Sequence, residues 1–196
     1  MHCAELIEEV ARARADSHRT PHESTVERLS TALSRFTGTA ANQHYAATLS
    51  PTGNYTRVLL NSPADEFQVV LVLWGPGMGS PIHDHDETVG VVSALLGETE
   101  EIKYEVAEQD GGEVALAERS RFRISPARVT ELLPETDKRM HRMVNETDRW
   151  SATVHVYLFG IHRYRIFEHR GGDRYLPAET RLWFDRTDVA GEMPAR

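Results

Sequence analysis

Two histidines separated by one residue carry the clearest chemical signal in the sequence. His83 and His85 end the run GMGSPIHDH, which is rich in small and apolar residues and predicts a short strand. Side chains two positions apart on a strand point to the same face, so the two imidazoles converge while Asp84 turns away. Two imidazoles on one face can chelate a metal ion, provided that a further ligand comes from another segment of the chain.

His141 is the best candidate for this third ligand. It opens a second strand-like run, HRMVN, which is distant in sequence but within reach if the strands close into a barrel. A His-x-His pair alone is often only a surface pair or a hydrogen-bonded pair. The addition of His141 and Asn145, with Gly77 and Gly97 near the two runs, makes a metal site the better interpretation.

Few carboxylates could complete such a site. Glu87 would share the histidine face of an unbroken strand and is kept as a minor alternative ligand, whereas Asp84 and Asp86 share the opposite face. Three neutral imidazoles leave the charge of a divalent cation uncompensated, which favours anionic ligands such as a thiolate. Coordination positions also stay open, which predicts catalysis at the metal. Such a site accepts several metals, among them Zn, Ni, Mn and Cu.

A second group of polar side chains lies on one predicted strand. Thr153, His155 and Tyr157 alternate there, so a hydrogen-bonded relay can run from the threonine through the imidazole to the phenol. On an isolated strand these would more often be satisfied core residues, and the metal motif is what favours a catalytic role. Arg57 alone fits a surface position on an edge strand, but its planar guanidinium also suits bidentate carboxylate binding.

The elements that must position these residues are two helices followed by many short strands. Apolar residues recur at helical spacing over residues 4–14 and 23–36, and Gly38 suits a helix stop. The predicted strands cover residues 55–60, 67–74, 80–85, 90–96, 98–106, 121–124, 129–133, 140–145, 152–159 and 164–168, with a last one near 181–184. So many strands without intervening helices predict a mainly β sandwich or barrel, covered on one side by the two N-terminal helices.

Length and composition are compatible with one core. A chain of 196 residues with 40% apolar residues predicts a single domain over 1–196, with a helical cover over 1–50 and a β-barrel over 55–185. Residues 186–196 are expected to form a loosely ordered tail. Cys3, the one cysteine, cannot form an internal disulfide and lies too near the beginning of the chain to be a persuasive nucleophile.

Charge and hydropathy narrow the expected partners. The formal net charge of -8 and the lack of a Lys/Arg block disfavour nucleic acid and an anionic membrane, which leaves small molecules. The sequence shows neither a long apolar run nor an export leader, so a cytoplasmic protein is expected. Both a monomer and a small homo-oligomer are compatible with the sequence.

The order and spacing of these motifs resemble the cysteine dioxygenase type I family of thiol dioxygenases, in its bacterial form. The spacing Gly-x5-His-x-His, the later Gly97 and the pattern His-x3-Asn match the two motifs of the cupins. The more specific runs are YTR, LWGPG, SPIHDH, HRMVN and TVHVY, which begin at residues 55, 73, 80, 141 and 153. The fold that this resemblance implies is a cupin, a double-stranded β-helix or jelly-roll barrel.

The resemblance also implies a role for each matched residue. In that family three histidines bind Fe(II), an arginine binds the substrate carboxylate, and the tyrosine of a His-x-Tyr motif hydrogen-bonds near bound substrate and oxygen. The positions that match here are His83, His85 and His141 for Fe(II), Arg57 for the carboxylate, and Tyr157 with His155 for catalysis. The implied reaction uses O₂ to convert a small thiol, with cysteine as the first candidate, to its sulfinic acid.

Two positions depart from the family pattern. Mammalian members have a cysteine at the position of Gly90 that cross-links to the tyrosine, so no Cys-Tyr cofactor is expected here. The residues after Tyr157 read LFGIHRYR instead of the common Ser-Pro-Pro. Relatives that prefer 3-mercaptopropionate use an arginine from this later region. Arg163 or Arg165 is therefore an alternative substrate-binding residue, and 3-mercaptopropionate or another small thiol an alternative substrate.

Two further functions stay open at the level of sequence. One is a cupin oxygenase or isomerase that acts on a substrate without a thiol, because this barrel hosts many chemistries. The other is a non-catalytic metal-binding or ligand-binding cupin that acts as a sensor or storage module. The pair His155 and Tyr157 argues against the second, because mere binding does not need a phenol at that position.

Overall fold

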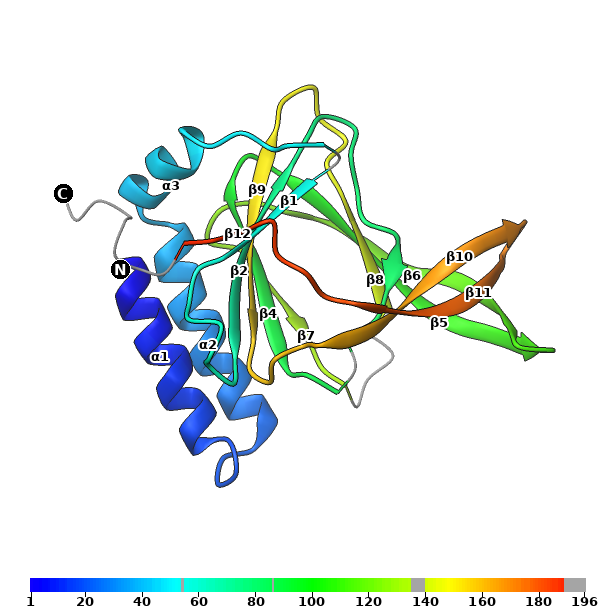
Figure 1. The fold of residues 1–196 in the computed structure, drawn as a ribbon, viewed down its shortest axis with the longest axis horizontal. Coiled ribbons are helices and arrows are strands. Elements are labelled where there is room, and N and C mark those ends of the chain that lie inside the picture. The colour runs from blue at the N-terminus through cyan, green and yellow to red at the C-terminus, as the bar shows by residue number, and fades with distance from the viewer. Residues whose placement is uncertain (54, 86, 135–139, 189–196) are drawn as a thin grey trace.

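The computed structural model describes residues 1–53, 55–85, 87–134 and 140–188 of the chain. Within these ranges three α-helices precede a series of strands (Figure 1). The helices are α1 (Cys3–Asp16), α2 (His22–Thr37) and α3 (Ala40–Ala47). The strands are β1 (Tyr55–Leu59), β2 (Gln68–Trp74), β3 (Ile82–His83), β4 (Gly90–Leu96), β5 (Thr99–Asp110), β6 (Glu113–Ile124), β7 (Val129–Leu132), β8 (Met140–Val144), β9 (Ser151–Tyr157), β10 (Arg163–Gly171), β11 (Arg174–Arg181) and β12 (Arg186–Thr187).

The two predicted helices are present, and a third follows them. α1 and α2 bury the apolar stripes that predicted them, which include Leu6, Val10, Leu29 and Leu33. The prediction of two helices missed α3. Its sequence, AANQHYAA, has no apolar stripe of helical period, and of its side chains only Asn42 and Ala46 are buried. Periodicity therefore gave no signal for this helix.

The strands form two sheets that face each other, as the mainly β prediction requires. The first has the order β12-β1-β2-β9-β4-β7, and the second closes on itself in the order β10-β11-β6-β5-β8-β3. Every residue of β2 is buried, because Val69, Leu71 and Leu73 pack with the helices while Val70 and Val72 point between the sheets. Figure 1 shows the helices covering the outer face of the first sheet. The inner faces of the two sheets enclose the second core, where the candidate site lies.

The largest errors in the predicted strands concern two long hairpins that extend from the barrel (Figure 1). β5 and β6 continue to Asp110 and Glu113, and the turn between them contains two glycines with positive φ. β11 was missed, and no strand forms over 181–184 beyond the last residue of β11. The outer parts of these hairpins are exposed, so alternation between apolar and polar residues no longer marks them.

The predicted loose tail needs a partial correction. Arg186 and Thr187 form β12, which pairs in parallel with Val58 and Leu59 of β1. Residues 189–196 of that predicted tail lie outside the described residues, as does Asn54. In the part of the chain that is described, no helix combines the length and apolar character needed to cross a membrane.

Candidate metal centre

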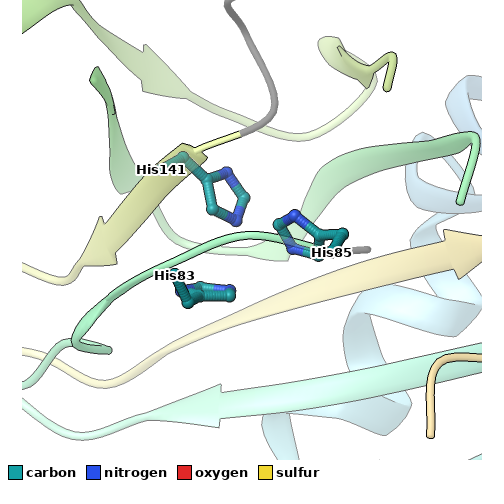
Figure 2. A group of neighbouring side chains, drawn as sticks. All are labelled: His83, His85 and His141. Atoms are coloured by element: carbon teal, nitrogen blue, oxygen red, sulfur yellow. The ribbon is translucent and has the colours of Figure 1, made fainter. Parts of the chain in front are cut away.

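Strand pairing brings the three predicted ligands together. His83 in β3 stands directly opposite His141 in β8, and His85 follows two residues after His83. One potential ligand atom from each imidazole lies within 4.8 Å of the others. The ring centroids are 4.6 to 4.8 Å apart, and Figure 2 shows the three rings converging on a common point.

In two of the rings the hydrogen bonds engage Nδ1, which leaves Nε2 as the nitrogen that can bind a metal. His83 Nδ1 lies 3.0 Å from the Pro81 carbonyl oxygen, and His141 Nδ1 lies 2.5 Å from Glu101 Oε1. Both partners are acceptors, so Nδ1 carries the hydrogen and the Nε2 lone pair faces the cluster. His141 Nε2 is buried and has no hydrogen-bond partner among the described residues. Burial lowers the pKa of His83 to about 4, which keeps this ring neutral and able to bind a cation. The residues present therefore fit a divalent metal.

Glu101 is a buried carboxylate that supports His141 from behind. This residue lies on β5, and its side chain is fully buried. Burial raises the pKa of the carboxyl group, whereas the Lys103 ammonium 3.8 Å away lowers it. Lys103 also donates to the Glu131 carbonyl oxygen at 2.8 Å. A carboxylate that accepts the Nδ1 hydrogen fixes both the tautomer and the orientation of a histidine that binds metal. No local sequence pattern marks Glu101 as part of the site.

The carboxylates considered from the sequence lie elsewhere. Glu87 is exposed and is not part of the cluster, so the minor alternative of a Glu87 ligand is not supported. Asp84 is buried and accepts hydrogen bonds from Arg165, at 2.8 Å from the backbone nitrogen and 2.6 Å from Nε. Asp86 lies outside the described residues. Among those described, the metal group consists of three imidazoles.

A continuous hydrogen-bonded relay reaches the site along β9. Trp74 Nε1 donates to Thr153 Oγ1 at 2.8 Å, and this hydroxyl lies 2.8 Å from His155 Nε2. His155 Nδ1 in turn lies 3.1 Å from the Tyr157 hydroxyl. The indole is only a donor, so the threonine accepts from Trp74 and can give its one hydrogen to the imidazole.

The direction of this relay determines what Tyr157 can do. If Thr153 donates to Nε2, then His155 carries its hydrogen on Nδ1 and donates to the phenol oxygen, so the hydrogen of Tyr157 is available to the cavity. Burial lowers the pKa of His155 to about 3 and raises that of Tyr157, so both groups are neutral near pH 7. The Tyr157 ring lies 5.6 Å from the ring of His85. The phenol is therefore a protonated donor beside the metal group.

A small cavity joins His83 and His85 of the metal group with the phenol and Arg57. Its volume is about 40 Å³, which exceeds the roughly 10–15 Å³ that a cavity needs to hold a water molecule. Only a small ligand fits this space. Its lining includes Arg57, His83, His85, Tyr157, Tyr164 and Leu182.

Arg57 is buried at this cavity without an acidic partner among the described residues. Its Nη2 donates to the hydroxyls of Tyr55 at 3.0 Å and Tyr164 at 3.3 Å. Its Nη1 is buried and has no hydrogen-bond partner there. A buried guanidinium with an unused N–H group is a ready site for an anion. Tyr164, which sequence analysis missed, forms part of this site through Arg57 and packs edge-on against His83.

The two alternative arginines have other partners. Arg163 is exposed and forms an ion pair with Glu179 at 2.6 Å. Arg165 is bound to Asp84, and neither arginine lines the cavity. Both lie on β10, where their spacing places them on one face, while Tyr164 between them points inward. The structure thus assigns the cavity to Arg57 and not to the later arginines.

Gly90 gives Tyr157 room. The two residues are partners in the ladder between β4 and β9. A Cβ atom at Gly90 would lie 2.7 Å from the Val156 carbonyl oxygen and 3.3 Å from the Tyr157 ring. A side chain at position 90 would therefore require the Val156 backbone to shift and would press on the Tyr157 ring.

Removal of the Glu101 charge tests its support of the metal. We expect Glu101→Gln to weaken binding of a divalent metal roughly 10- to 100-fold, because loss of such a partner loosens the orientation and basicity of His141. The Kd is measured by competition with a chromophoric chelator. Glu100→Gln is the matched control, since Glu100 pairs with Arg121 and does not contact His141. Equal affinities of the two variants would contradict this role.

The buried neutral His155 predicts a pH dependence of stability. Its pKa is about 3 in the folded protein and near 6.5 when unfolded, so the unfolded state takes up the proton first as the pH falls. The contribution of His155 is complete above pH 6.5 and is lost toward pH 3. Between these values, His155→Gln should lessen the slope of unfolding free energy against pH by about 1.4 kcal/mol per unit. Urea denaturation of metal-free wild type and variant at several pH values measures it, and identical slopes would refute it.

Comparisons with known proteins found several solved structures that resemble this chain. Solved structures with similar folds include a cupin domain of an XRE family transcriptional regulator from Enterobacter cloacae, with 16% identity, a TM-score of 0.41, and coverage of 55% of this chain and 99% of the other. A sugar phosphate isomerase of the cupin superfamily from Silicibacter pomeroyi has 19% identity, a TM-score of 0.42, and coverage of 61% and 69%. An oxalate oxidase has 15% identity, a TM-score of 0.42, and coverage of 57% and 56%.

The family comparison covers most of the chain. The model of the family described as cysteine dioxygenase type I matches residues 21–170, a range that contains the three histidines, Arg57 and the relay on β9. The two sheets with this histidine group between them have the cupin fold predicted from the sequence. The chain belongs to the cysteine dioxygenase type I family.

Proposed function

We propose that the protein is a thiol dioxygenase that uses Fe(II) and O₂ to convert a small thiol carboxylate, with cysteine as the first candidate, to its sulfinic acid. The observation that carries the proposal is one small cavity with three groups of different chemistry. The first is a group of three imidazoles without a carboxylate ligand among the described residues, of which His83 and His85 line the cavity. The others are a phenol that can donate a hydrogen bond and a buried guanidinium without an acidic partner among those residues.

The proposed reaction balances in atoms and electrons, and the groups of the site suit it. Both atoms of O₂ are added to the sulfur of R–SH to give R–SO₂H, so sulfur loses four electrons, O₂ gains four, and no further reductant is required. Fe(II) held by His83, His85 and His141 would supply the redox chemistry, which no side chain of this site provides. The protein contributes the position of the substrate, the exclusion of water and the placement of one proton.

Charge makes the cavity selective for an anionic substrate. Arg57 is buried without a carboxylate partner among the described residues, and Asp84 is neutralised by Arg165. Neutral imidazoles add no negative charge. A molecule with a thiolate at one end and a carboxylate at the other would compensate both the metal and Arg57. Cysteine and 3-mercaptopropionate share this arrangement, and the small volume of the cavity disfavours longer thiols.

The relay gives Tyr157 its role in the proposal. When Thr153 donates to Nε2 of His155, His155 donates to the phenol oxygen, and the hydrogen of Tyr157 is then directed away from His155. The phenol can therefore donate a hydrogen bond to an oxygen or carboxylate of the bound reactants. Trp74, Thr153 and His155 form the chain of hydrogen bonds that positions this phenol.

Thiol-dependent oxygen uptake by protein of known metal content tests the proposal. Metal-depleted protein is loaded with Fe(II) or with Zn(II), and O₂ uptake and product mass are measured with cysteine, 3-mercaptopropionate and cysteamine. We expect one O₂ consumed per sulfinate with Fe(II), and no uptake without metal or with redox-inactive Zn(II). Absence of uptake with every thiol at full iron occupancy would sink the proposal.

The same assay separates the two rival functions. A cupin oxygenase or isomerase of another substrate class would be active in the absence of a thiol. A binding or storage module would retain a thiol tightly and return it unaltered after incubation with Fe(II) and O₂. Neither rival needs a phenol that lines the cavity and is linked to Trp74 through Thr153 and His155.

Loss of the Tyr157 hydroxyl should slow the reaction without loss of metal. We expect Tyr157→Phe to lower kcat about 100-fold, the usual effect of removing a donor that faces developing charge. Metal affinity should be unchanged, because the phenol is not a ligand. Tyr45→Phe serves as control, since Tyr45 lies on α3 and its hydroxyl bonds to Asp188. Equal kcat values for the two variants would show that Tyr157 only packs.

A further inference from the structure

A segment beyond the family match runs past the cavity. Residues 182–188, here called the C-terminal strap, connect β11 to β12 and continue one residue beyond it, whereas the family model ends at residue 170. Figure 1 shows this red part of the chain running from the end of β11 to the edge of the sheet at β1. At one end of the strap, Leu182 N donates to the His162 carbonyl oxygen at 3.2 Å. At the other end, Asp188 N donates to the Leu59 carbonyl oxygen at 2.8 Å. Leu182 also lines the cavity.

The strap is fixed to the residue that carries the buried guanidinium. Arg57 N donates to Asp185 Oδ2 at 2.8 Å, and Asp185 N donates back to the Arg57 carbonyl oxygen at 2.9 Å. The next two strap residues pair with Val58 and Leu59. These contacts fix the register of the strap relative to Arg57, so side chains from the strap meet the guanidinium at a defined place.

Trp183 is the strap residue that meets it. The guanidinium carbon of Arg57 lies 4.7 Å from the centroid of the Trp183 ring and 4.7 Å from that of Tyr55. Trp183 is 53% exposed, while Arg57 is only 9% exposed. The indole therefore faces solvent on one side and a buried cation on the other. Such a contact is attractive, and an indole at this place also lowers the local dielectric constant around the charge.

We propose that Trp183 is a positioning residue for substrate recognition, which caps Arg57 and holds its guanidinium ready for a carboxylate. This inference rests on the proposed function for the identity of the ligand. Arg57 has two phenol hydroxyls as acceptors for Nη2, and Nη1 has no partner in the described part of the chain. Shielding by the indole strengthens the attraction between Nη1 and a carboxylate, because water no longer competes for the same charge.

Kinetics with two thiols that differ by the carboxylate test the cap. For Trp183→Ala we expect the KM for cysteine to rise roughly 2- to 30-fold, in line with the strength of cation–π contacts. The kcat for cysteine and both constants for cysteamine, which lacks the carboxylate, should stay unchanged. Trp183→Phe keeps an aromatic ring and should recover most of the loss. Thr187→Ala, an exposed position on the same strap, should behave as wild type.

Chemical labelling of Arg57 provides a readout that needs no activity. Phenylglyoxal reacts with accessible guanidinium groups, and mass spectrometry of the peptide that contains Arg57 gives its rate. We expect Trp183→Ala to raise this rate several-fold over wild type and Thr187→Ala to leave it unchanged. The experiment uses metal-free protein of the full chain, with an unchanged melting temperature as the check on folding.

The two readouts separate the cap from the proposed function. If wild type consumes no O₂ with any thiol, the dioxygenase proposal fails, but labelling still decides whether Trp183 covers Arg57. If labelling is the same in Trp183→Ala and wild type, the cap is refuted. A KM that rises equally for cysteine and cysteamine would also refute it, because a general disturbance of the cavity does not distinguish the carboxylate.

Discussion

The antiparallel pairing of β3 with β8 is the contact on which the site depends. β3 has only two residues, yet it places His83 opposite His141 and lies between β8 and β10 in the closed sheet. Directly after β3, the backbone nitrogen of Asp84 donates to the Arg165 carbonyl oxygen on β10. The Asp84 carboxylate accepts from the backbone nitrogen and from Nε of Arg165. A ladder this short is reinforced by neighbouring contacts, and the Asp84–Arg165 pair adds two hydrogen bonds to the carboxylate between His83 and His85.

This dependence explains why the sequence predicted the ligands better than their surroundings. A His-x-His pair and a distant histidine are local patterns, and alternation on β9 could be read from TVHVY. The roles of Glu101 and Tyr164 depend on which strands are neighbours, which no local pattern contains. Glu101 is a charged residue inside a strand, where the usual expectation is exposure. The ion pair of Arg165, one of the two alternative substrate-binding arginines, is hidden from local patterns in the same way, because its partner Asp84 lies 81 residues away.

The fold shows the same division between local and distant information. β4 was predicted with its observed bounds, and the uninterrupted run QVVLVLW predicted β2, since a strand buried on both faces is apolar throughout. The helix α3 and the outer parts of the long hairpins lack such a pattern. β12 is two exposed residues whose strand character comes from pairing with β1. Its pairing with Val58 and Leu59 places it next to Arg57 in the sheet.

The buried Arg57 gives the strongest physical reason to expect an anionic ligand. A cation taken out of water is costly unless compensated, and phenol hydroxyls with aromatic rings compensate it only in part. If Arg57 only stabilised the fold, we would expect a carboxylate beside it, as Asp84 lies beside Arg165. The absence of such a partner for Arg57 among the described residues leaves part of the cost to be offset when a ligand binds. Substrate binding and the relief of this uncompensated charge would then be the same event.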